Sequence, residues 1–66
     1  MKFKARLKEL REEKHLSISA LSNILNVNHS TISRWERGEI IPSAEHLYNI
    51  CKHFGISADY LLGLED

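Results

Sequence analysis

The sequence predicts an all-α fold, a compact bundle of five short helices, and three observations support this prediction. Apolar residues recur at spacings of three and four along most of the chain, as they do on the buried side of a helix. No segment alternates apolar and polar residues for long enough to indicate a strand. The three glycines and the single proline fall where helices should end or begin. With 66 residues the chain has the size of one domain, residues 1–66.

The first helix is expected to run from about residue 3 to Lys14. Phe3, Leu7 and Leu10 are spaced by four and three, which places them on one side of a helix, and charged residues fill the positions between them. His15 follows at a place where a helix often ends in a left-handed residue, a conformation that usually favours glycine but that histidine tolerates.

The second helix is expected to follow Ser17, a residue type that favours the N-cap position. Asn26 ends it, because asparagine is the second choice after glycine for a left-handed turn residue. The residues expected to share its inward side are Ile18, Leu21, Ile24 and Leu25.

A third helix is expected from an N-cap at Asn28 through Arg37, with Gly38 as its stop. Ile32 and Trp35 are its inward residues, and Trp35 is expected to be part of the core. Only about three residues separate the second and third helices, which is the spacing of a helix-turn-helix.

Two further helices complete the chain. Pro42 and Ser43 open the fourth, and Gly55 ends it. Ser57 caps a short fifth helix, residues 58–62, that ends at Gly63. The apolar stripe of the fourth helix consists of Leu47, Ile50, Cys51 and Phe54.

The outward side of the third helix is polar, and this suggests a binding function. A helix with an exposed first turn presents free backbone N–H groups and the positive end of its dipole. The major groove of B-DNA is about 12 Å wide and admits one helix, and helix-turn-helix proteins read base edges with the first residues of their second helix. The outward residues here are Asn28, His29, Ser30, Thr31, Ser33, Arg34 and Arg37.

Charge is unevenly spread although the formal net charge is zero. Residues 1–14 hold six cations and three anions, whereas residues 39–66 hold one cation and five anions. The basic first half suits an anionic partner, and ordinary solvated surface charge explains the same pattern equally well.

Other classes of function find little support. Cys51 is the only cysteine, so no internal disulfide forms, and the longest apolar run, residues 60–62, is too short for a membrane span or a signal peptide. His46 and His53 are seven residues apart, too far to share a metal unaided, and the HExxH, CxxC and glycine-rich phosphate motifs are missing. We therefore expect a cytoplasmic protein that is not an enzyme and that binds no metal, cofactor or small molecule.

The run LSISALSNILNVNHSTISRWERGEIIPSAEHLYNICKHFGISADYLLG resembles the Cro/C1-type (XRE-family) helix-turn-helix DNA-binding domain of phage and bacterial repressors. The resemblance covers about residues 3 to 63, and its motifs are STISRWERG, the PS that follows, FGIS and DYLLG. It implies a five-helix bundle of the lambda-repressor-like type. It also implies a regulator of transcription, most simply a repressor, that binds a roughly palindromic double-stranded DNA operator as a homodimer.

The resemblance also assigns roles to individual residues. Arg34 is the expected guanine reader, because its planar fork fits two acceptors of that base at once. The expected base contacts are Asn28, His29, Ser30, Ser33 and Arg34. The expected phosphate contacts are Ser17, Ser19, Thr31, Arg37 and Gly38. Arg11 and Glu36 match a pair that often forms a salt bridge between the first and third helices.

The chain departs from the family pattern at four positions. Ile18 replaces a glutamine at the start of the second helix, which removes one expected DNA contact. His15 and Asn26 occupy two usual glycine positions, and Ser22 replaces a small alanine. Both turn residues remain compatible with a left-handed backbone.

An alternative function is a protein-interaction module, such as an antitoxin or an adaptor, built on the same fold. That function would need an exposed apolar patch. The only candidate patch in the sequence is Ile40, Ile41, Tyr60 and Leu64, and we interpret it as a dimer surface.

Overall fold

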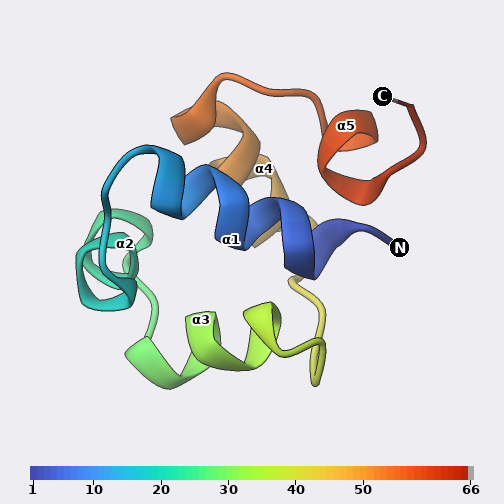
Figure 1. Cartoon of the computed structure of the whole chain (residues 1–66). Helices are drawn as coiled ribbons and strands as arrows, with labels where there is room; N and C mark the ends of the chain where they lie inside the picture. The colour runs from blue at the N-terminus through green and yellow to red at the C-terminus, as the bar shows by residue number, and fades with distance from the viewer. Residues whose placement is uncertain (66) are drawn as a thin grey trace.

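The computed structural model describes residues 1–65 and shows five α-helices joined by short connections (Figure 1). Residues 1–65 contain no strand, so the predicted all-α fold is confirmed. The helices are α1 (Phe3–Glu13), α2 (Ile18–Leu25), α3 (His29–Glu36), α4 (Ala44–Phe54) and α5 (Ala58–Leu62). The predicted ends of two helices were one residue too long, because Lys14 and Arg37 are C-cap residues rather than helical ones.

Serine hydroxyls cap three of the helices as the sequence predicts. Ser17 accepts a hydrogen bond from the Ala20 N–H at 3.0 Å, and the serines before α4 and α5 cap their helices in the same way. Asn28 holds the N-cap position of α3, but its side chain makes no capping bond. The Thr31 N–H is instead bonded to the Asn28 carbonyl at 3.0 Å, so the Asn28 amide remains available for another partner.

Two left-handed residues shape the turns on either side of α2. His15 and Asn26 both have φ of 57°, and they occupy the positions at which the sequence predicts this conformation. The chain after each is fixed by a bond back into the preceding helix, from Leu16 N–H to the Arg11 carbonyl and from Val27 N–H to the Ser22 carbonyl, each at 3.0 Å.

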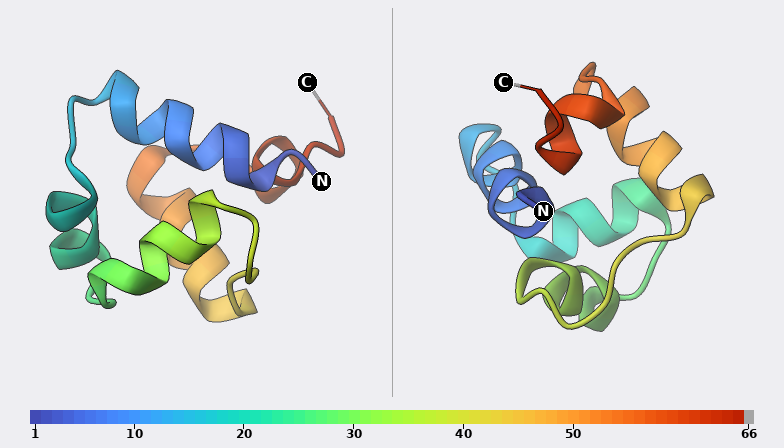
Figure 2. Two further views of the ribbon diagram at one scale, coloured as in Figure 1. Left: turned by 60° about the horizontal axis from the view of Figure 1, so that its bottom comes forward. Right: turned by 90° about the vertical axis from the view of Figure 1, so that its right-hand side faces the viewer.

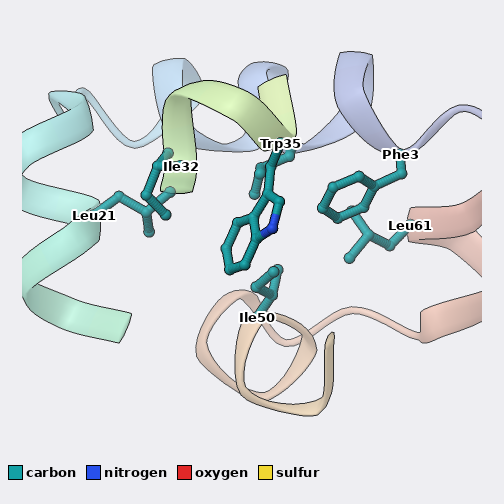
Figure 3. Packing of buried hydrophobic residues seen from close by; sticks show 7 residues of the cluster. Phe3, Leu21, Ile32, Trp35, Ile50 and Leu61 are labelled. Carbon is teal, nitrogen blue, oxygen red and sulfur yellow. The ribbon is translucent and has the colours of Figure 1, made fainter. Parts of the chain in front are cut away.

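The core forms around Trp35, and every helix contributes to it (Figure 3). The Trp35 ring meets the Phe3 ring edge-on with 6.4 Å between centroids, and the His46 ring lies 5.4 Å from it. The prediction that Trp35 belongs to the core is therefore confirmed. The buried apolar residues are Phe3, Leu7, Leu21, Ile32, Trp35, Ile50 and Leu61.

One apolar residue of the predicted stripes is exposed. Ile24 keeps 45% of its surface exposed, because α2 packs against α3 and α4 and its eight residues bury only one side. Cys51 packs against the core on the predicted stripe of α4 and is half-buried, and this burial raises the pKa of its thiol.

Arg6 fastens the N-terminal helix to α5. Its guanidinium donates to the carbonyls of Tyr60 and Glu65, the second at 3.2 Å, and lies 4.1 Å from the centre of the Tyr60 ring. The Lys2 N–H donates to the Leu62 carbonyl at 3.3 Å. Tyr60 is consequently half-buried, which corrects its place in the predicted exposed patch.

Candidate nucleic-acid interface

α3 lies along one edge of the molecule with its outer side uncovered (Figure 1). It packs against α1 and α2 through its buried residues Ile32 and Trp35. In the right-hand view of Figure 2 α3 again lies at the bottom of the molecule, and in the left-hand view the side that is uncovered in Figure 1 turns toward the viewer. The short connection at residues 26–28 thus presents the first turn of α3 to solvent.

The side chains at the expected base-contact positions are free to bind a partner. Asn28, His29, Ser30 and Arg34 are exposed, and Ser33 is half-buried. Within residues 1–65, no hydrogen bond or ion pair engages any of these five side chains. These five side chains therefore present hydrogen-bond donors and acceptors that have no partner within residues 1–65.

The expected phosphate-contact positions are less uniform. Ser17 and Ser19 are exposed at the start of α2, although the Ser17 hydroxyl already accepts the capping bond. Thr31 is half-buried rather than fully outward. Arg37 is exposed, but its Nε lies 3.0 Å from Glu39 Oε2 in an ion pair. Gly38 adopts φ of 75°, a left-handed conformation that favours glycine, and ends α3.

Arg11 and Glu36 form a two-pronged ion pair that joins α1 to the end of α3. Arg11 Nε donates to Glu36 Oε2 at 2.7 Å, and Arg11 Nη2 donates to Glu36 Oε1 at 2.9 Å. Arg11 Nη1 also donates to the Leu16 carbonyl at 2.9 Å. The hydrogen bond with Glu36 raises the pKa of Arg11, against an opposing effect of burial. This pair connects α1, the start of α2 and α3 behind the exposed edge.

The sequence alone leaves open whether the cations of the first helix, Lys2, Lys4, Arg6 and Lys8, contact the DNA backbone or only solvent, and the structure places Lys4 beside the loop that follows α3. A Cβ atom placed on Gly38 would lie 2.9 Å from Lys4 Cδ and 3.4 Å from Lys4 Nζ. Lys4 precedes Arg11 by seven residues, about two helical turns, so both lie on the side of α1 that meets α3.

Other kinds of site are not indicated in the described part of the chain. Residues 1–65 contain no group of three or more histidine, cysteine or acidic residues that could hold a metal ion. None of the five helices is long and apolar enough to cross a membrane.

Comparison with known proteins identifies similar helix-turn-helix proteins. The family model described as "Helix-turn-helix" matches residues 7–61. The chain is 38% identical over 66 residues to the HTH-type transcriptional activator BcrR of Enterococcus faecalis, covering 100% of this chain and 32% of that protein. It is 35% identical over 57 residues to Repressor protein C2 of Salmonella phage P22, covering 86% of this chain and 26% of that protein. The chain therefore spans a third or less of the length of these curated relatives.

A solved structure has the same architecture. The solution structure of the DNA-binding domain of the P22 C2 repressor matches with a TM-score of 0.82 and 33% sequence identity. The match covers 91% of this chain and 79% of that domain. This similarity confirms the predicted lambda-repressor-like bundle.

Proposed function

The chain belongs to the Cro/C1-type helix-turn-helix family of DNA-binding transcription regulators, and we propose that it binds a specific duplex operator through α3. In this proposal the first turn of α3 enters the major groove, where Asn28, His29, Ser30, Ser33 and Arg34 meet base edges. Ser17, Ser19, Thr31, Arg37 and the Gly38 loop meet backbone phosphates. The protein then acts in the cytoplasm, where this DNA lies.

One observation supports the proposal above all others. The two apolar residues of α3, Ile32 and Trp35, are buried. The side chains of Asn28, His29, Ser30 and Arg34 are exposed and unpartnered within residues 1–65. Short polar side chains on an uncovered helix end match the donors and acceptors of base edges, whereas a docking site for a protein would need an apolar surface there.

We further propose that two copies bind side by side on an inverted repeat. Ile41 and Leu64 keep 67% and 74% of their surfaces exposed, and Ile40 and Met1 are also exposed. The N-terminus, the loop after α3 and α5 all face the viewer in the right-hand view of Figure 2. An apolar face next to α3 would let a two-fold dimer present two α3 helices to successive major grooves. Such binding over a promoter would repress transcription.

Selection of bound sites from random duplexes tests the proposal directly. We expect one inverted repeat to be enriched, and we expect its affinity to fall steeply as salt rises, because phosphate contacts release counterions. If no sequence is enriched and salt has no effect, the alternative use of this fold as an antitoxin or adaptor that binds protein would be favoured instead.

Substitution of Arg34 tests base reading by α3. Arg34→Ala should cost about 1–3 kcal/mol on the selected operator and relax the preference at one base pair. Arg37→Ala is the matched control, because a phosphate contact should weaken binding to all sequences alike. Uniform weakening by Arg34→Ala would assign Arg34 to the backbone rather than to a base.

A further inference from the structure

The loop after α3 has almost no net positive charge of its own. Arg37 and Glu39 neutralise each other across 3.0 Å, and the next two residues are isoleucines. A DNA phosphate approaching this loop would meet the Glu39 carboxylate as well as Arg37. Arg37 can still donate to a phosphate, but net positive charge at this end of α3 has to come from another part of the chain.

The cations of α1 differ in whether other groups of the protein already bind them. Arg6 is held by carbonyls of the C-terminal segment and by the Tyr60 ring, and Arg11 is held by Glu36 and the Leu16 carbonyl. Neither guanidinium can leave its partners without loosening the packing between helices. Lys4 is exposed and engages no acidic group within residues 1–65.

Lys4 also lies next to the loop after α3. Its aliphatic stem runs against Gly38, close enough that a Cβ on that residue would meet Lys4 Cδ at 2.9 Å. The glycine therefore leaves room for the lysine side chain to cross the loop. A shallow hollow of about 210 Å³ adjoins this contact, and it is lined by Lys4 and Gly38 together with the apolar residues Met1, Phe3, Trp35, Ile40 and Ile41.

We propose that Lys4 binds a DNA backbone phosphate beside the Gly38 loop, so that α1 supplies the positive charge that the loop lacks. This inference rests on the proposed function, since it names a further contact of the same interface. The contact belongs to the sequence-independent part of binding, because an ammonium is a point charge without the paired donors that read a base.

The test compares Lys4→Gln with Lys14→Gln on the selected operator across a salt series. Both changes remove one charge from the α1 segment, but Lys14 stands at the opposite end of that helix. Loss of one phosphate contact should reduce the slope of log affinity against log salt by about 0.9. Lys4→Gln should show that loss, and Lys4→Arg should restore the slope. Lys14→Gln should leave it unchanged.

A second measurement locates the contact on the DNA. Duplexes with one phosphate replaced by a neutral methylphosphonate are bound to the wild type and to Lys4→Gln. One replacement should reduce the salt slope of the wild type by about 0.9 and should not reduce that of Lys4→Gln further. Equal slopes for Lys4→Gln and the wild type, with every replacement affecting both proteins alike, would overturn the inference. The proposed function fails separately, if the wild type binds no duplex in a salt-dependent way.

Discussion

The ion pair of Arg11 and Glu36 joins α1 to α3 on the side of α3 away from its exposed polar residues. Their side chains are only 11% and 7% exposed, so the two charges are largely removed from water and depend on each other. Removing one partner of a buried ion pair leaves the other charge unpaired away from water, which strongly lowers the free energy of unfolding. Glu36 is the last residue of α3, so its ion pair with Arg11 holds the C-terminal end of α3 against α1.

Arg11→Ala should therefore lower the free energy of unfolding by about 3 kcal/mol, near the lower end of the range for buried pairs. This is a large part of the roughly 3–10 kcal/mol expected for a domain of this size. Urea unfolding followed by circular dichroism measures the change. Arg37→Ala is the control, because the Arg37–Glu39 pair is 58% and 52% exposed and should contribute less than about 1 kcal/mol. Losses of the same small size in both variants would contradict a structural role for Arg11.

The turns around α2 depend on backbone conformation more than on side-chain contacts. His15 and Asn26 share φ of 57°, yet asparagine adopts this conformation more readily than histidine. Ser22, buried where the family has alanine, donates its hydroxyl to the Ser19 carbonyl at 2.7 Å and so leaves no unpaired polar atom there. The second helix thus tolerates three departures from the family pattern without losing its geometry.

His15→Gly should stabilise the protein by about 0.5–1 kcal/mol. The left-handed conformation costs a non-glycine residue about 1–2 kcal/mol, and the greater freedom of glycine in the unfolded chain offsets part of that gain. A thermal unfolding curve should show a rise in Tm of about 4 °C. Asn26→Gly should raise Tm less, because asparagine is less strained there. A fall in Tm for His15→Gly would mean that the imidazole makes a stabilising contact.

Local sequence features predict the elements well but not how they pack together. Capping serines such as Ser17, and stops such as Gly55, act within one turn of the chain, so the sequence alone locates the helix ends. Ile24 follows the apolar stripe of its helix, yet it is exposed because a short helix has too few neighbours to bury it. The contacts of Lys4 with Gly38 and of Arg6 with Tyr60 join distant segments, and no local pattern determines which segments meet.

The molecule as a whole divides into a polar edge along α3 and an apolar face beside it. The two share the loop after α3, which begins at the helix and continues into Ile40 and Ile41. Net charge is zero, so attraction to DNA has to come from where the cations lie rather than from their number. In the proposed dimer, the same arrangement would place the second copy of the chain next to the DNA rather than on the far side of the domain.

Ile41→Gln tests this arrangement and should reduce affinity for the full inverted repeat at least tenfold, with little effect on a single half-site. Burial of an isoleucine contributes about 1.5–3 kcal/mol, and a two-fold interface loses that contribution from both copies. Titration of both duplexes, with sedimentation to count the copies bound, gives the ratio of the two affinities.

Ile24→Gln is the matched control, since Ile24 is also exposed but lies on α2, outside the apolar face. It should leave the ratio unchanged. If Ile41→Gln weakens the half-site as much as the repeat, Ile41 acts on the fold or on the DNA contact of one copy, and the dimer would have to form through another surface.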